Sequence, residues 1–143
     1  MTVARILAEK GSSVVTVSPD KTLEDVIQIL ADKRIGALVA AHADGTVAGI
    51  ISERDIMRAL ARHGGSAFDA PVSAHMTTAV TTCGRSTTIE EVMALMTDGR
   101  FRHVPVCEDG RLIGLVSIGD VVARKIASVE AEQQALRDYI TMA

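Results

Sequence analysis

The ten residues VAGIISERDI, Val47 to Ile56, recur further along the chain as LIGLVSIGDV, Leu112 to Val121. Each stretch passes from apolar residues through a glycine to a serine, and an aspartate follows three residues after that serine. The sequence upstream also repeats, since TLEDVIQIL from Thr22 matches TIEEVMALM from Thr88. Repetition at a nearly constant displacement is the signature of a duplicated structural unit. The sequence therefore predicts two copies of one unit within 143 residues.

Each copy has the pattern of a β-α-β-β-α unit. A short β-branched run, Val14 to Val17 or Val80 to Thr81, precedes apolar residues spaced three and four apart, as in an amphipathic helix. Two strand-like segments follow, joined by Asp44-Gly45 in the first copy and by Asp109-Gly110 in the second. These pairs predict hairpins because glycine readily adopts the positive φ that a tight turn needs. A second helix is expected after the serine.

The expected fold class is α/β (α+β), with two repeats packed pseudo-symmetrically through their sheets and a long C-terminal helix. A unit of about 60 residues buries little surface alone, and a sheet with helices on one face leaves its other face bare. We therefore expect the two bare faces to pack together, with two equivalent clefts. The predicted division is 1–64 for the first repeat, 65–74 for a linker and entry to the second repeat, 75–125 for the second repeat and 126–143 for a C-terminal helical extension.

The segment after Asp120 contains no glycine or proline, which predicts a single helix to near the end of the chain. Along it, six positions at alternating steps of four and three residues form a heptad-like seam: Val122, Ile126, Val129, Gln133, Leu136 and Ile140. About three heptads are the lower limit for a coiled coil, so the seam could pack on its own domain or on a second copy. The hypothesis we favour is a homodimer through this helix.

Composition excludes several classes of function. Aromatic residues make up 2% of the chain and the formal net charge is −3, so neither base stacking nor a basic footprint for nucleic acid is expected. Cys83 and Cys107 lack a CxxC partner, and no His or Cys lies at metal-ligand spacing, which predicts free thiols and no metal. With no signal-peptide pattern and no run of membrane-spanning length, a cytoplasmic protein without membrane contact is predicted.

The stretches Gly49 to Asp55 and Gly114 to Asp120 resemble the Gly-h-h-Ser/Thr-x-x-Asp signature of the CBS domain (cystathionine β-synthase motif), where h is hydrophobic. Arg100 to Val106 resembles the basic, proline-containing strand that precedes the hairpin in that family. The resemblance covers nearly the whole chain and implies a stand-alone tandem CBS pair, or Bateman module. It further implies a regulatory sensor of AMP, or alternatively of ADP, ATP, NAD, NADH or S-adenosylmethionine, that forms flat dimers and acts on an effector protein.

The Ser-x-x-Asp pattern has both a binding and a structural interpretation. Free N–H groups at a helix N-terminus suit a phosphate, and an acceptor-only carboxylate can receive both hydroxyls of a ribose. The same pattern is also a variant of the capping box, in which the aspartate bonds back to the serine. Thr22 to Asp25 and Thr88 to Glu91 have the same form and are expected only to cap helices. The binding and capping roles of the motif can coexist.

The resemblance implies two sites, each combining one motif with strands of the opposite repeat. The first site would contain Ser52, Arg54, Asp55, Ala79, Val80, Arg102, His103 and Pro105. The second site would contain Ser117, Asp120, Val14, Val15, Ala37 and Val39. Arg102 and His103 can neutralise phosphate, whereas the corresponding Gly36 and Ala37 carry no charge. The first site is therefore predicted to prefer phosphorylated ligands, and the second to be weaker or to take a less charged adenosine compound.

The leading functional hypothesis is a non-catalytic sensor of energy or redox state, in which nucleotide binding between the repeats changes their arrangement and a partner protein responds to the change. The alternative is a structural dimerisation or interaction module whose clefts stay unoccupied and whose motifs only cap helices. An enzyme is not expected, because the four histidines lie in predicted turns, a linker or a strand, without a nucleophile or paired carboxylates beside them.

Overall fold

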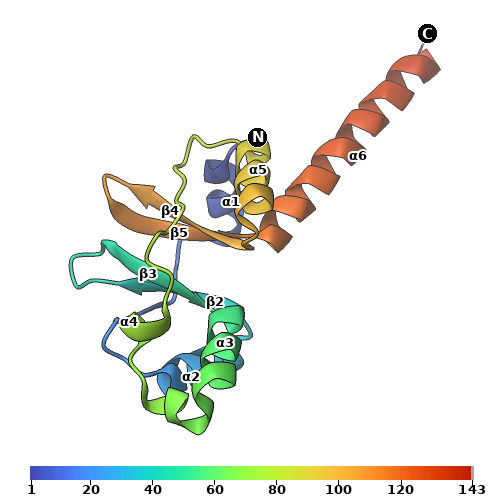
Figure 1. Ribbon diagram of the computed structural model, residues 1–143. Coiled ribbons are helices and arrows are strands. Elements are labelled where there is room, and N and C mark those ends of the chain that lie inside the picture. Colours follow the sequence, from blue (N-terminus) through green and yellow to red (C-terminus); the bar gives the residue numbers. More distant parts are fainter. Residues whose placement is uncertain (143) are drawn as a thin grey trace.

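The computed structural model describes residues 1–142. It contains a three-stranded sheet of β1 (Thr16–Val17), β2 (Ala37–Ala41) and β3 (Val47–Ser52), and a two-stranded sheet of β4 (His103–Glu108) and β5 (Arg111–Ser117). The helices are α1 (Val3–Lys10), α2 (Leu23–Lys33), α3 (Glu53–His63), the 3-10 helix η1 (Gly64–Asp69), α4 (Val72–His75), α5 (Ile89–Gly99) and α6 (Ile118–Met142). The two sheets lie in the middle of the molecule, with helices on their outer sides (Figure 1).

The predicted duplication is confirmed. Helices α2 and α5 both begin at a threonine whose side chain accepts a hydrogen bond from the third helical residue, and both end at an arginine in the left-handed conformation, Arg34 and Arg100. Each is followed by an antiparallel hairpin, β2–β3 or β4–β5. The backbone bond from Glu53 N to Gly36 O, 3.0 Å, recurs as Ile118 N to Arg102 O, 2.8 Å. The structure is thus the expected α/β fold with two small sheets and a long C-terminal helix.

The second repeat lacks the first strand that its sequence predicts. Instead of a strand at Val80 to Thr81, the structure has an isolated parallel bridge between Cys83 and Val106. The next hydrogen bond of this ladder would require an N–H group at position 105, and Pro105 has none. The proline therefore limits the strand to one bridge, whereas β1 pairs with β2 through two residues.

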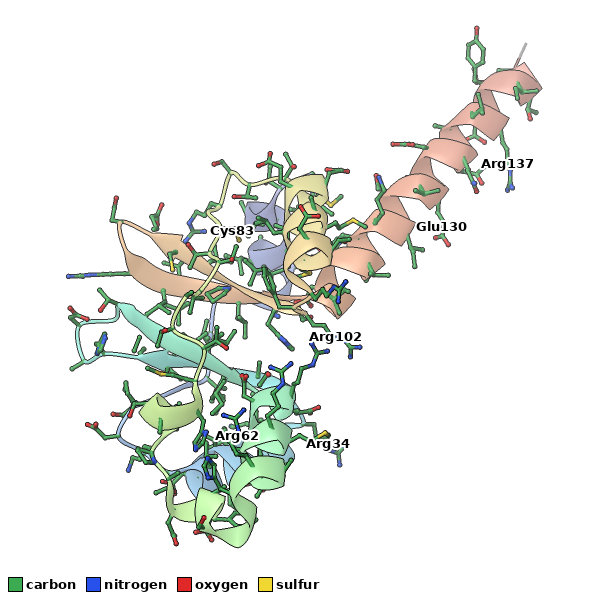
Figure 2. All side chains as sticks on the ribbon, in the orientation of Figure 1. Arg34, Arg62, Cys83, Arg102, Glu130 and Arg137 are labelled. Carbon is green, nitrogen blue, oxygen red and sulfur yellow. The ribbon has the colours of Figure 1, made fainter. Side chains whose placement is uncertain are left out.

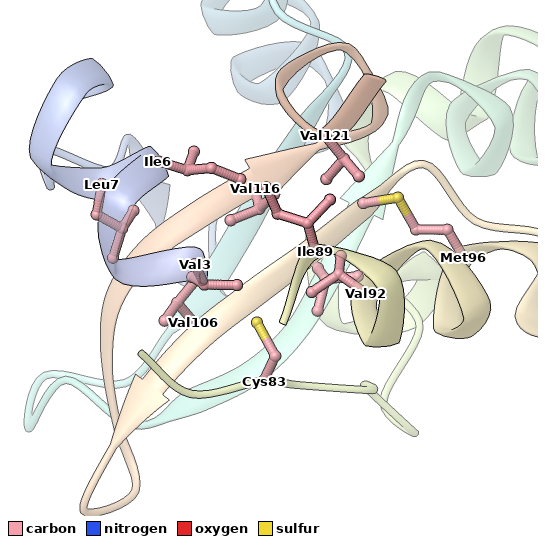
Figure 3. Packing of buried hydrophobic residues seen from close by; sticks show 11 residues of the cluster. Val3, Ile6, Leu7, Cys83, Ile89, Val92, Met96, Val106, Val116 and Val121 are labelled. Carbon is pink, nitrogen blue, oxygen red and sulfur yellow. The ribbon is translucent and has the colours of Figure 1, made fainter. Parts of the chain in front are cut away.

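Each repeat receives its N-terminal segment from the opposite half of the pair. Helix α1 precedes the first repeat in sequence but packs on the second, where Val3, Ile6 and Leu7 join the apolar core of α5, β4 and β5 (Figure 3). The bond from Val3 N to Thr87 O, 2.9 Å, fixes the start of α1 there. Correspondingly, Val72 N donates to Lys21 O at 2.7 Å, and Val72 lies in the core of the first repeat. Neither docking was predictable from the local pattern of the sequence.

The predicted C-terminal helix is confirmed as a single element of 25 residues. Val121 is fully buried against the second repeat, but beyond it α6 extends away from both sheets (Figure 1). Arg124 pairs with Glu9, and Lys125 lies 3.4 Å from Glu90, so the first turns of α6 are tied to α1 and α5. Among the helices of residues 1–142, none combines the length and apolar character needed to cross a bilayer.

Candidate functional site

Both motif aspartates cap the helix that they begin. Asp55 Oδ2 accepts hydrogen bonds from Ser52 N and Oγ at 2.9 and 3.0 Å, while Ser52 Oγ accepts one from Asp55 N at 3.4 Å. Asp120 has the same arrangement with Ser117, at 2.9, 2.9 and 3.2 Å. All the bonds of these carboxylates to their own helices use Oδ2. The capping interpretation therefore describes the local geometry, and it leaves Oδ1 of each carboxylate for another partner.

The two motifs differ in their environment because a lysine reaches one of them. Lys10, at the end of α1, donates from Nζ to Asp120 Oδ2 at 2.6 Å and to the Leu115 carbonyl oxygen at 2.9 Å. Burial alone would raise the pKa of Asp120, but the bonds from Lys10 and Ser117 outweigh it, and the pKa is lowered. Within residues 1–142, no lysine forms the corresponding bond to Asp55.

Sequence reasoning missed Lys10 because it lies 110 residues from Asp120. The signal that could have been used is the spacing of Val3, Ile6 and Leu7, which is that of an amphipathic helix with one apolar side. That pattern would have predicted α1, with Lys10 in its last turn. It would not have predicted the repeat on which α1 packs.

His103 lies between the two motif helices. Its ring is near Gly36, since a β-carbon built on Gly36 would lie 3.5 Å from His103 Cε1 and 3.6 Å from Glu53 Oε1. Burial lowers the pKa of His103, and the charges of Lys10 and Arg102 lower it further, while Glu53 and Asp120 act in the opposite direction. The net effect is a lowered pKa. His103 was assigned to the first site, but the structure also brings it near Asp120 of the second.

The other residues assigned to the two sites differ in how accessible they are. Arg54 is exposed, and its Nη1 donates to the Arg100 carbonyl oxygen at 3.3 Å, which joins the start of α3 to the segment that leads into β4. The exposed members are Arg102, Ala79 and Val15, and the half-buried ones are Val14 and Val80. The members with buried side chains are Ala37, Val39 and Pro105. A ligand could meet those three only through small shifts or through their backbone.

Asp55 also borders a hollow that the sequence did not predict. The hollow has a volume of about 230 Å³ and is lined by Asp55, Arg58, Ala59, Arg62, Ala74 and His75. It lies between α3 and α4, and none of the strand residues assigned to the first site lines it. Arg58 and Arg62 make no ion pair within the described chain, so this side of Asp55 is positively charged. An anionic group beside Asp55 would meet these two guanidinium groups.

The lowered pKa of His103 predicts a pH-dependent stability. A histidine with a lowered pKa in the folded state stabilises the fold fully above its unfolded value, 6.5, and loses this contribution as the pH falls through the folded value. Between about pH 7 and pH 5, the wild type should therefore lose more thermal stability than His103→Asn. Melting temperatures at both pH values measure the difference. His42→Asn, in an exposed turn, is the control and should keep the wild-type dependence. Parallel pH curves for wild type and His103→Asn would contradict the prediction.

Two pseudo-equivalent hairpins, each leading through a serine into a helix with an aspartate in its first turn, define a tandem-repeat regulatory module. The chain belongs to the CBS domain family, whose sequence profile matches residues 4–62 and 72–126. The crystal structure of the CBS-domain containing protein ATU1752 from Agrobacterium tumefaciens is 45% identical to this chain, with a TM-score of 0.84 over 87% of this chain and 92% of the other. The suggested family and the pairing of two CBS domains are thereby confirmed.

Two further solved relatives hold adenosine compounds. The CBS domain protein PAE2072 from Pyrobaculum aerophilum, complexed with AMP, is 26% identical, with a TM-score of 0.75 over 84% of this chain and 89% of that one. The CBS domain pair of protein MJ0100, in complex with 5′-methylthioadenosine and S-adenosyl-L-methionine, is 25% identical, with a TM-score of 0.78 over 90% and 97% of the two chains.

Proposed function

We propose that the chain is a non-catalytic sensor of energy or redox state that binds an adenine nucleotide, with AMP as the leading candidate. The observation that carries the proposal is the duplicated Ser-x-x-Asp helix start, in which each carboxylate caps its helix through Oδ2 alone. The complexes of two relatives with AMP and with S-adenosylmethionine support an adenosine compound as the ligand. ADP, ATP and NAD(H) share the adenosine group and are tested alongside.

In the first site, each residue type has a distinct role. The ribose diol would donate to Asp55, and the phosphate would accept from an N–H group at the start of α3. The Ser52 hydroxyl donates to Asp55 Oδ2 in the structure, so it would have to exchange that bond for one to the phosphate. Arg102 and His103 would add charge-assisted bonds to the phosphate, because a phosphate beside the His103 ring favours its charged form. Glu53 opposes phosphate binding by its charge. Arg102 and the protonated His103 must therefore outweigh the negative charges of Glu53 and Asp55.

In the second site, Lys10 changes the competition for Asp120. A ribose diol would have to share the Asp120 carboxylate with Lys10 or displace Lys10 Nζ, which donates to Asp120 Oδ2 at 2.6 Å. Removing the lysine in Lys10→Met should therefore strengthen adenosine binding at this site, by about fivefold, or roughly 1 kcal/mol. Calorimetric titration with adenosine and with AMP measures the change, and Lys33→Met, at the exposed end of α2, is the matched control. Weaker binding in Lys10→Met would show instead that the lysine contacts the ligand.

A thermal-shift screen with AMP, ADP, ATP, NAD, NADH and S-adenosylmethionine tests the proposed function directly. A ligand that binds only the folded state raises its stability by about 2.7 kcal/mol at a hundred times its dissociation constant. At least one compound should raise the melting temperature and emerge from incubation unchanged. No shift with any compound would favour the alternative, a structural dimerisation module with unoccupied sites. Turnover of the bound compound would contradict the non-catalytic assignment.

The module is proposed to act as a homodimer on an effector protein of unidentified class. Ligand binding can change the surface presented to the effector only if the ligand has different affinities for two arrangements of the repeats. The bond from Arg54 Nη1 to the Arg100 carbonyl oxygen, which crosses between the repeats beside the first site, is one contact that such a rearrangement would alter. Neither nucleic acid nor a membrane is a proposed partner.

A further inference from the structure

The projecting part of α6 carries an apolar side with no partner in the described chain. Its members expose between 39% and 64% of their surface: Val122, Ile126, Val129, Leu136 and Ile140. They follow one another at steps of four, three, seven and four residues, and Gln133 occupies the step between Val129 and Leu136. This is the a/d spacing of a coiled coil, with Ile126, Gln133 and Ile140 at the a positions.

Charged residues flank this seam in a complementary pattern. With Ile126 at position a, Lys125 and Glu132 occupy g positions, and Glu130 and Arg137 occupy e positions. In a parallel pair of helices, each g residue faces the e residue five positions later on the partner. Lys125 would then face Glu130 of the second copy, and Glu132 would face Arg137. Glu130 and Arg137 both lie on the projecting part of α6 (Figure 2).

In an antiparallel pair, fewer of these charged residues would face an opposite charge on the partner helix. There, e residues face e residues and g residues face g residues. The alignment that joins Glu130 to Arg137 places Glu132 opposite Tyr139 and gives Lys125 no partner among residues 1–142. Only two of the four charges would be paired. The charge pattern therefore favours a parallel, in-register pair.

The way that α6 leaves the globular body gives a second helix room to approach. Val121 points into the core, and successive helical residues are rotated by about 100°, so the seam that begins at Val122 faces sideways from the body. Arg124 contacts Glu9 of the body from another side of the helix, and Lys125 contacts Glu90 from the edge of the seam. Only the Lys125 contact, 3.4 Å long and exposed, would have to be shared with a partner.

We propose that α6 pairs with α6 of a second copy of this chain as a parallel, in-register, two-stranded coiled coil. Gln133, a polar residue at the central a position, fixes the register because its amide is satisfied only opposite another polar group. Both globular bodies then lie at the same end of the coil. The pairing does not depend on nucleotide binding.

The first experiment tests whether the seam makes the dimer. Sedimentation equilibrium of the full chain should show a monomer–dimer equilibrium in the micromolar range. Ile126→Glu with Leu136→Glu should weaken it at least tenfold, whereas Ala127→Glu with Ala131→Glu, on the outer side of the same helix, should leave it unchanged. The proposal would be overturned if the chain were monomeric at every concentration, or if the seam substitutions left the dimer dissociation constant unchanged. Circular dichroism and the melting temperature verify that each variant is folded.

The second experiment tests orientation and uses mild changes. Glu130→Lys should weaken the dimer several-fold, and adding Lys125→Glu should restore it, because the swapped pair is again complementary. In a Cys107→Ser background, Leu136→Cys should form an intermolecular disulfide on mild oxidation, since identical d positions meet only in a parallel pair. Ala131→Cys is the control. Burial raises the pKa of Cys83 to about 11, so its thiol should not react. Failure of Leu136→Cys to cross-link in a chain that still dimerises would overturn the parallel arrangement.

Discussion

Replacing Asp55 with alanine is expected to weaken AMP binding by about 100-fold or more, with the protein still melting in one cooperative transition. Each hydrogen bond to a charged acceptor contributes about 1.5–3 kcal/mol, and the ribose diol would make two such bonds to this carboxylate. Since 1.4 kcal/mol corresponds to a factor of ten, even partial replacement by water leaves a loss of this size. Calorimetric titration of the folded variant measures the loss.

The control for this experiment is present in the same chain. Asp25 and Thr22 form the same capping box at the start of α2, with distances of 3.1, 3.1 and 3.2 Å. Asp25→Ala should lower the stability by about 1 kcal/mol, as Asp55→Ala does, because both lose one cap. Only Asp55→Ala should lose affinity. Equal affinities in the two variants would show that the motif aspartate caps its helix and does nothing more.

Gly49→Ala is expected to lower the free energy of unfolding by about 2–3 kcal/mol. A β-carbon at this position would lie 2.6 Å from Met76 Sδ and 2.8 Å from the Thr77 carbonyl oxygen. Thr77 is held there by two backbone bonds to Ile50, of 2.9 and 3.0 Å, so the clash cannot be relieved by a side chain alone. Urea denaturation measures the loss.

The equivalent glycine of the second repeat provides a comparison. A β-carbon on Gly114 would meet only the side chain of Leu7, at 2.6 Å from Cδ2. A leucine tip can change rotamer, so Gly114→Ala should cost about 1 kcal/mol. Gly65→Ala, with nothing within 4 Å, should be close to neutral. If Gly114→Ala were less stable than Gly49→Ala, a clash with the Leu7 side chain would cost more than a clash with the Thr77 backbone, which would contradict the prediction.

The features that could be predicted from the sequence are those encoded by local pattern and by repetition. The turns at Asp44-Gly45 and Asp109-Gly110 are confirmed, with positive φ at both glycines, because turn chemistry is local. The two Ser-x-x-Asp helix starts are confirmed as caps for the same reason. The long C-terminal helix follows from twenty-odd residues without a helix breaker.

The features that could not be predicted depend on contacts between distant segments. The pairing of Lys10 with Asp120 requires knowing that α1 docks on the second repeat, and local periodicity does not say where a helix packs. The second sheet has only two strands because the hydrogen bond that would extend its third strand needs an N–H group at Pro105. That could be predicted only by knowing which residues the third strand would pair with. The hollow beside Asp55 depends on α4, most of which lies in the segment 65–74 that was predicted as a linker and entry to the second repeat. For the site itself, the residue types were predictable and their surroundings were not.

The reciprocal docking of α1 and of the segment around Val72 has a consequence for how the chain folds. Each half has the form of one subunit of a domain-swapped dimer, with the two subunits fused into one polypeptide. A fragment that ends after α3 would carry α1 without the surface on which it packs, and would lack Val72 from its own core. Unfolding of either half therefore removes a piece of the other, and the pair should fold and unfold as a single cooperative unit.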